Sequence, residues 1–471
     1  MSIINNIRMI NHPLFGDTSV DLSSKSKGNS NYFSLIIGDN GTGKSELLKS
    51  IIEGLKFNET YRDQLPGLFE GSGIAEYHFN DGNFDFPSKT IASSFILNDK
   101  FPQSIAGSGF LSRTYKYLGI RSASNNAFIG KYKTDFIDAF GFIIESKSKK
   151  NSFVALLDYL DLKKDFSFKV LTRPQAHKIF QLAANSNSHK TFINILEREA
   201  ASLRDSKRMS DQRLYRIFFT DEDKTHSLKL YKAARNYYLN RNKFNLEIDF
   251  MDEISCKRFL NISPVIKTLL DANLLSIGDF YISKDYSFAN ASSGQFHIFS
   301  SMVKITAELC DNAIILIDEP EVSLHPKLQL NYISALKKIL DGFNGCHVII
   351  ATHSHFLVSS LPIDNASVIT SNKSGEKINF EILSASTSGW SAESILYNVF
   401  GVMTARSNSF ESDLNIIASL MSNWDASEKS TSVYKNALSR INRFKLPDND
   451  PLNVFSEKAA AFLEERLNAG I

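Results

Sequence analysis

An eight-residue run of glycines and polar residues near the N-terminus constrains the fold more than any other stretch of the chain. Residues 38–45, GDNGTGKS, match the pattern G-x-x-x-x-G-K-[ST] and separate an apolar strand pattern, NYFSLII, from a helical pattern, SELLKSIIEGL. Glycines let backbone N–H groups approach phosphate oxygens, and the N-terminus of the following helix adds a favourable dipole. The run therefore predicts a P-loop between a buried strand and a helix of an α/β fold.

The predicted P-loop would bind the phosphates of ATP. Lys44 would reach the β- and γ-phosphates, and the Ser45 hydroxyl would be a ligand of Mg²⁺. ATP and Mg²⁺ are therefore the predicted cofactors. The residues of this run that we expect to bind ATP are Gly38, Asn40, Gly41, Thr42, Gly43, Lys44 and Ser45.

A second motif, IILIDEPEVSLHP, supplies acidic residues at the end of an apolar strand pattern. The strand would deliver Asp318 to the edge of the P-loop, where its carboxylate can hold Mg²⁺ through water. Glu319 is one residue further and projects differently, which is where a general base for the attacking water is needed. After a P-loop, this motif predicts the hydrolytic half of the site.

A third strand pattern, VIIATHSHF, ends in two histidines. His353 at its tip would contact the γ-phosphate and orient the nucleophile, whereas His355 is less well placed. Asn98 or Asp99, which follow the strand pattern TIASSFIL, would sense Mg²⁺. The predicted catalytic residues are Glu319, His353 and Lys44, and the predicted metal ligands are Ser45, Asp318 and one of Asn98 and Asp99.

Composition excludes several classes of protein. The chain has 471 residues, 43% apolar and 22% charged, and its net charge of +2 offers no global argument for nucleic acid. Its three cysteines form no CxxC pair, which argues against a disulfide framework or a zinc site. Because no run of 18 apolar residues and no signal-peptide pattern occurs, we expect a cytoplasmic protein with no membrane contact.

The periodicity of apolar residues divides the chain into four parts. Strand patterns in residues 1–100 and 276–400 predict two lobes of one head, the first with the P-loop. Residues 101–275 carry long helical patterns and predict a helical insertion for dimerisation or ligand binding. Residues 401–471 predict a helical C-terminal region.

The string ASSGQ, residues 291–295, resembles the signature loop of ATP-binding-cassette (ABC) ATPases. Ser292, Gly294 and Gln295 match that loop, whereas Ala291 and Ser293 depart from its commonest Leu and Gly. In that family the loop caps the γ-phosphate of ATP bound to another head. The resemblance therefore implies a homodimer that holds ATP between its heads, with contacts in trans from Ser292, Ser293, Gly294 and Gln295.

The motif DEPEVSLHP resembles the OLD-, RecF- and SMC-like ABC ATPases rather than membrane transporters. The resemblance implies an ABC-ATPase head with a mixed sheet, and a D-loop at Ser323 to His325. Together with the tail motif WSAESILYNVFGVMTAR, it extends to the ATPases of bacterial anti-phage systems, most of all the PtuA ATPases of Septu, with the AriA ATPases of PARIS as near competitors. In that group the ATPase forms an oligomer and controls a separate effector nuclease, of HNH type in Septu.

Two classes of function stay open. The chain is either an ATP-switched scaffold that regulates a nuclease in trans or a RecF-like ATPase that clamps DNA during repair or recombination. Residues 190–245 hold 13 Lys and Arg against 7 Asp and Glu, interleaved with Phe and Tyr, which suits contact with a DNA or RNA backbone. A solvated helical face or a dimer contact is equally compatible with this pattern.

We expect no nuclease activity on this chain, whereas the resemblance to anti-phage ATPases implies a nuclease on a partner chain. Asp448 and Asp450 have the spacing of a Toprim metal site, but no apolar strand pattern precedes them. The segments that follow hold too few strand patterns to build such a domain.

Overall fold

The computed structural model describes most of the chain and divides it into two compact units, Met1–Trp390 and Ser391–Ile471. Each unit is considered by itself. The described residues are 3–23, 30–61, 72–80, 84–94, 96, 98–119, 128–174, 176–195, 224–240, 244, 246–282, 286–383, 387, 389–390, 394–396, 408–424, 427–442 and 451–468.

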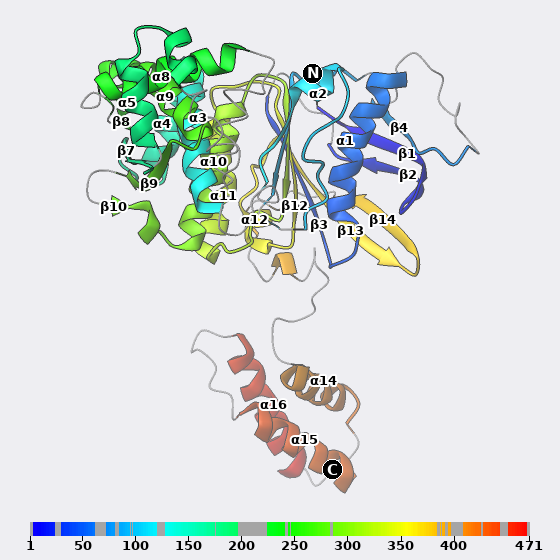
Figure 1. Ribbon diagram of the computed structural model, residues 1–471. Helices are drawn as coiled ribbons and strands as arrows, with labels where there is room; N and C mark the ends of the chain where they lie inside the picture. The colour runs from blue at the N-terminus through cyan, green and yellow to red at the C-terminus, as the bar shows by residue number, and fades with distance from the viewer. Residues whose placement is uncertain are drawn as a thin grey trace. The chain divides into compact units, whose positions relative to one another are not determined.

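Within the described residues of the first unit, a seven-stranded mixed sheet forms the centre (Figure 1). Its order is β14-β13-β3-β12-β11-β5-β6, in which only β13 and β14 are antiparallel. Strands β11 and β12 are buried along their whole length, as apolar runs covered on both faces should be. The predicted α/β head with a mixed sheet is confirmed. The strands are β3 (Tyr32–Gly38), β5 (Lys89–Ser94), β6 (Tyr115–Tyr117), β11 (Ala313–Asp318), β12 (His347–Thr352), β13 (Ala366–Ser374) and β14 (Lys377–Ile382).

Helices cover both faces of this sheet (Figure 1). Helix α1 (Lys44–Tyr61) lies on one face, and α10 (Ser293–Glu308) and α11 (Pro326–Leu340) lie on the other. Leu47 and Ile51 of α1 share a buried core with strand residues such as Ile349. This packing fixes the first turn of α1, and therefore the P-loop, at one edge of the sheet. Near α1 lies an antiparallel sheet of order β2-β1-β4, with β1 (Asn6–His12), β2 (Gly16–Asp21) and β4 (Glu76–Phe79).

The segment between the two lobes contains strands as well as helices, so the prediction of a helical insertion is wrong in this respect. The sequence DFSFKV alternates apolar and polar residues as a strand does, but the surrounding helical patterns predict helices throughout. An antiparallel sheet of order β10-β9-β7-β8 is formed by β7 (Asp165–Thr172), β8 (Leu246–Asp249), β9 (Leu275–Ile282) and β10 (Tyr286–Ser287). The described helices of the segment are α2 (Phe110–Thr114), α3 (Phe128–Glu145), α4 (Lys147–Tyr159), α5 (Ala176–Asn185), α8 (Lys224–Leu239) and α9 (Glu253–Asp271).

Two strands pair across the predicted domain boundaries. Strand β6 comes after residue 100, yet it pairs with β5 in the central sheet. Strand β9 lies almost wholly in the predicted C-terminal lobe, yet it pairs with β7 of the insertion. The head therefore includes β6 beyond the first predicted boundary, and the insertion includes β9 beyond the second.

Phenylalanines form the core of the insertion. The ring centroid of Phe140 lies 5.2 Å from that of Phe166 and 5.4 Å from that of Phe250, and Phe166 and Phe280 stack at 5.8 Å. Phe192 and Tyr231, in the segment predicted to contact nucleic acid, are also buried, so these rings are not exposed for base stacking. Residues 196–223 lie outside the described residues, and nucleic-acid contact there stays a prediction.

The described part of the second unit consists of three helices, α14 (Asn408–Ser422), α15 (Glu428–Ile441) and α16 (Pro451–Asn468). Tyr434 is fully buried among them, and its hydroxyl donates to Ala459 O at 3.0 Å. Most of the tail motif, and both Asp448 and Asp450, lie outside the described residues. No helix in the described parts of the chain combines the length and the apolar character that crossing a bilayer requires.

Candidate active site

The carboxyl ends of three neighbouring strands bring the predicted catalytic residues together. Strands β3, β12 and β11 are adjacent and parallel; the P-loop follows β3, His353 follows β12, and Asp318 ends β11. Ligands of α/β sheets bind at this edge because the loops after the strands converge there. As a result, Ser45 and Asp318, 273 positions apart in the sequence, are joined by a hydrogen bond.

Lys44 is held inside the P-loop. Its ammonium donates to Gly38 O at 2.9 Å and to Asp39 O at 2.8 Å, and the residue is only 5% exposed. Burial lowers the pKa of Lys44, although nearby carboxylates oppose this effect. A buried ammonium whose hydrogen-bond acceptors here are neutral carbonyls would be stabilised by a phosphate anion, so Lys44 fits ATP.

The shape of the P-loop depends on Gly43. Its φ of 86° lies in the left-handed region, and a Cβ there would lie 2.6 Å from Cε1 of the buried Phe15 ring. Neither the backbone nor the space tolerates a larger residue. Thr42 stabilises the loop further, because its side chain donates to Asp39 O at 2.8 Å and its carbonyl accepts from Ser371 of β13. Asn40 and Gly41 are exposed at the tip.

Ser45 and Asp318 form the arrangement expected of a magnesium site. The Ser45 hydroxyl donates to Asp318 Oδ1 at 2.9 Å, and Asp318 is 2% exposed. Burial, together with the charges of Glu319, Asp99 and Glu321, raises the pKa of Asp318 to about 7. Such concentrated negative charge fits a divalent cation, and Mg²⁺ is usually bound by one or two carboxylates together with substrate phosphates.

The protein's own side chains offer only part of a metal shell. Among the described residues, no group of three or more His, Cys, Asp or Glu side chains is arranged to hold a metal ion by itself. Of the two predicted sensors, Asn98 is exposed, whereas Asp99 is buried and accepts from the Tyr117 hydroxyl at 2.6 Å. Asp99 therefore fits the site better than Asn98.

Glu319 and His353 face each other beside the metal site. Glu319 has a φ of 46°, an uncommon conformation for a residue other than glycine. Its Oε1 lies 3.7 Å from His353 Nε2. Burial, and then the charge of Lys44, lowers the pKa of His353, so the imidazole is neutral at neutral pH. A carboxylate beside a neutral imidazole can accept a proton from water.

The structure adds Glu321, which the sequence analysis did not single out. Its carboxylate accepts a hydrogen bond from the backbone N–H of His353, and burial raises its pKa. The sequence motif DEPE contains Glu321 as its second glutamate, to which the sequence analysis assigns no role.

The four signature residues lie at the start of α10. Ser292 caps this helix and forms a reciprocal capping box with Gln295, and both side chains are exposed, as is Ser293. A Cβ on Gly294 would lie 2.9 Å from Ser323 O, so a glycine is needed for the helix to pack against the predicted D-loop. The structure thus joins the signature to the D-loop of the same chain and leaves its polar side chains facing outward.

The other two histidines of these motifs have structural contacts. His325 caps α11, where its Nδ1 accepts from Lys327 N at 3.3 Å. His355 lies in the short helix α12 (His355–Ser359), and its ring is 4.0 Å from that of Phe356.

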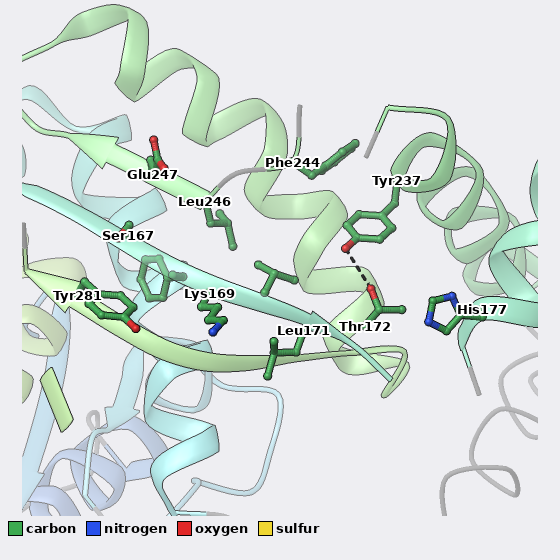
Figure 2. Close-up of a pocket in the computed structure, with 12 residues that line it drawn as sticks. Ser167, Lys169, Leu171, Thr172, His177, Tyr237, Phe244, Leu246, Glu247 and Tyr281 are labelled. Carbon is green, nitrogen blue, oxygen red and sulfur yellow. Dashed lines mark hydrogen bonds between the residues drawn. The ribbon is translucent and has the colours of Figure 1, made fainter. Parts of the chain in front are cut away.

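A separate cleft of about 540 Å³ lies on the insertion (Figure 2). Lys169 of β7, Glu247 of β8 and Tyr281 of β9 line it, and the Tyr237 and Thr172 hydroxyls at one end are 3.4 Å apart. It shares no lining residue with the candidate active site. Antiparallel sheets commonly leave one face in water, and this cleft lies on such a face.

The raised pKa of Asp318 predicts a stability that depends on pH. The folded protein holds this proton more tightly than the unfolded chain, whose pKa is near the ordinary 3.8, so the free energy of unfolding falls as pH rises from about 4 to about 7. Asp318→Asn removes the ionisable carboxyl and with it this loss of stability at higher pH. In metal-free buffer at pH 8 the variant should melt several degrees above the wild type, and the gap should close near pH 4 when followed by calorimetry.

Asp341→Asn is the matched control for this titration, because the Asp341 side chain is 66% exposed. It should leave the melting temperature unchanged across the same pH range. A gap between Asp318→Asn and the wild type that does not vary with pH would contradict the raised pKa.

Comparison with known proteins supports an ATPase. A family model described as an AAA ATPase domain, AAA_15, matches residues 290–358. This segment contains the signature loop, Asp318, Glu319 and His353, but it does not include the P-loop. Protein ea59 of Escherichia phage lambda is 32% identical over 83 residues, which are 18% of this chain and 16% of the phage protein.

Two solved structures show a loose overlap with the chain. A structure of an SMC head bound to the C-terminal winged-helix domain of ScpA is 10% identical, with a TM-score of 0.30, over 81% of this chain and 97% of that one. UvrA2 from Deinococcus radiodurans is 11% identical, with a TM-score of 0.29, over 83% of this chain and 57% of that one. At such scores the overlap carries no argument about mechanism, which rests on the residues of the site.

Proposed function

We propose that the chain is an ABC-type ATPase that closes as an ATP-dependent homodimer and controls a separate effector nuclease in anti-phage defence. The observation that carries the ATPase is the convergence of Lys44, Asp318, Glu319 and His353 at adjacent strand ends. The match of residues 290–358 to an AAA ATPase domain supports the same activity.

Each residue of the site has a distinct task in hydrolysis. ATP would supply the phosphoryl group, and Mg²⁺ bound with it would neutralise part of the phosphate charge. Lys44 would bind the phosphates, and Ser45 and Asp318 would hold the metal. Glu319 would take a proton from the attacking water, while the neutral imidazole of His353, 3.7 Å away, would orient that water.

The homodimer rests on the signature loop. Ser292, Ser293 and Gln295 are exposed, and Ser292 begins a 16-residue helix whose first N–H groups suit an anion. The resemblance to ABC ATPases implies that this loop acts on ATP bound by a second copy of the chain. Each copy has its own P-loop and an exposed signature loop. Two copies could therefore complete each other's ATP sites, each with its signature loop on the ATP of the other.

The control of a nuclease rests on the resemblance of DEPEVSLHP and the tail motif WSAESILYNVFGVMTAR to anti-phage ATPases. It predicts that phage protection requires both this chain and a separate nuclease, and that Lys44→Ala abolishes protection in a plaque assay. Strong stimulation of the isolated ATPase by duplex DNA would instead favour a RecF-like clamp. The plaque assay and the DNA-stimulation assay together separate the two classes of function.

The signature loop gives a direct test of the homodimer. Ser292→Arg should leave ATP binding at the chain's own P-loop intact and block hydrolysis, because the added side chain would occupy the place of the neighbour's γ-phosphate. In a mixture with Lys44→Ala, one composite site per heterodimer escapes both defects, since its P-loop comes from the Ser292 variant and its signature from the Lys44 variant. Partial recovery of phosphate release is expected.

ATP-dependent dimerisation should be followed in parallel by light scattering, because a cycle that requires two intact sites would hide the recovery. The trans role of the loop is wrong if the mixture stays inactive and dimerisation responds neither to ATP nor to Ser292→Arg.

A further inference from the structure

One side chain of α11 links the segment that follows the proposed general base, Glu319, to the turn that carries His353. Gln329 donates from Nε2 to Leu324 O at 2.8 Å, and its Oε1 accepts from the Ser354 hydroxyl at 2.6 Å. Leu324 lies in residues 319–325, here called the D-loop segment, which begin at Glu319 and end with the predicted D-loop. Ser354 directly follows His353. A single amide therefore spans both segments.

Ser354 is itself fixed by its surroundings. It is 5% exposed, its backbone N–H donates to Thr352 Oγ1 at 2.9 Å, and its hydroxyl caps α12 by accepting from Leu357 N at 3.4 Å. The hydroxyl has one proton to donate, and that proton goes to Gln329. The turn that carries His353 is thereby tied to α11.

A second link joins the same two segments. Glu321 lies two residues after the proposed base, Glu319. Its carboxylate accepts a hydrogen bond from the backbone N–H of His353. The signature helix packs on this region as well, since Gly294 lies against Ser323 O and the buried His297 forms a hydrogen bond with the backbone of Val322. The D-loop segment is thus held between the His353 turn and the signature helix.

We propose that Gln329 is a positioning residue of the ATPase, which sets the His353 turn relative to Glu319 within its own chain. The inference rests on the proposed function and deepens it. Gln329 acts through Leu324 and Ser354 and touches no reacting group. An amide suits this place because it donates to a carbonyl and accepts from a hydroxyl at once.

The variants that test this role differ in which half of the amide they retain. Gln329→Met keeps the length and loses both hydrogen bonds, whereas Gln329→Glu keeps the acceptor for Ser354 and loses the donor to Leu324 O. Ser354→Ala removes the partner on the other side. Leu330→Ala is the control, because it is the next residue of α11 and is 42% exposed.

Gln329→Met should lower kcat for ATP hydrolysis by roughly 10- to 100-fold, the range expected when a catalytic group is displaced by about 1 Å. The Kd for ATP should stay within about twofold of wild type, because the P-loop contacts are untouched. Gln329→Glu should have an intermediate effect. Gln329→Met combined with Ser354→Ala should be no worse than the stronger single variant, since both act through one link.

A mixture of Gln329→Met with Ser292→Arg tests whether the effect stays within one chain. One composite site of the heterodimer takes its His353 turn from the Ser292 variant and its signature from the Gln329 variant. Phosphate release should recover there. If the mixture stays inactive while Ser292→Arg mixed with Lys44→Ala recovers, Gln329 acts through its own signature helix and the inference is wrong.

Two further results would overturn the inference. One is a Gln329→Met protein with wild-type kcat, and the other is a loss of activity explained by a matching loss of folded protein in calorimetry. These outcomes differ from failure of the proposed function, which would appear as a wild-type protein without ATPase activity. Failure of the proposed function would remove both proposals.

Discussion

Glu319→Gln should reduce ATP hydrolysis by roughly 100-fold or more while ATP binding persists, because general-base catalysis typically contributes about 10²–10⁴-fold. The amide retains the size of the side chain and its contact with His353, but it cannot accept a proton from water. Asp318 and Ser45 are unchanged, so the metal ligands remain. We expect single-turnover phosphate release to fall and the ATP-bound dimer to accumulate in light scattering.

Glu308→Gln is the control for this variant. Glu308 ends α10 and pairs with Lys89 at 2.9 Å, so its neutralisation removes a carboxylate without touching the site. It should hydrolyse ATP at the wild-type rate. Normal turnover by Glu319→Gln would show that another group is the base, and the buried Glu321 would be the next residue to test.

The sequence predicts the head of this protein well because its motifs are local. A P-loop needs only a strand, eight residues and a helix, and an acidic pair after an apolar run needs only a strand end. Strands β3, β11 and β12 are each predicted from an apolar run, and the structure shows that they are neighbours in one sheet.

The parts that the sequence analysis missed depend on contacts between distant segments. Strands β7 and β8 are separated by more than 70 residues, and β8 is only four residues long, so no local period reveals their pairing. Gln329 has an unremarkable position in an amphipathic helix. Its importance emerges only when α11 lies beside the His353 turn, and the same holds for Glu321.

Phenylalanine content shows how composition can mislead. Interleaved aromatic and basic residues in the insertion favour nucleic-acid binding as much as a helical face. Phe192 and Tyr231, two of the described rings in residues 190–245, are instead buried, with ring centroids 5.1 Å apart. Burial, which the sequence does not display, decides the role of these two rings.

Lys44→Ala should weaken ATP binding by roughly 100-fold or more, since a hydrogen bond to a charged group is worth about 1.5–3 kcal/mol and Lys44 would make such contacts to two phosphates. The variant also leaves the carbonyls of Gly38 and Asp39 without the ammonium that now binds them, so the loop loses its own organiser. Titration calorimetry with ATP and Mg²⁺ measures the change.

Lys49→Ala separates a specific role of Lys44 from a general loss of positive charge on α1. Lys49 lies on the same helix, but its ammonium pairs with Glu46 at 3.0 Å and with Glu53 at 3.1 Å, and its side chain is 34% exposed. Removing it should leave the affinity for ATP within about twofold, because exposed ion pairs contribute little. Equal losses in the two variants would mean that the charge of the helix, rather than the Lys44 ammonium inside the P-loop, governs binding. An unchanged affinity in Lys44→Ala would contradict the P-loop itself, and with it every assignment at the strand ends that depends on bound ATP.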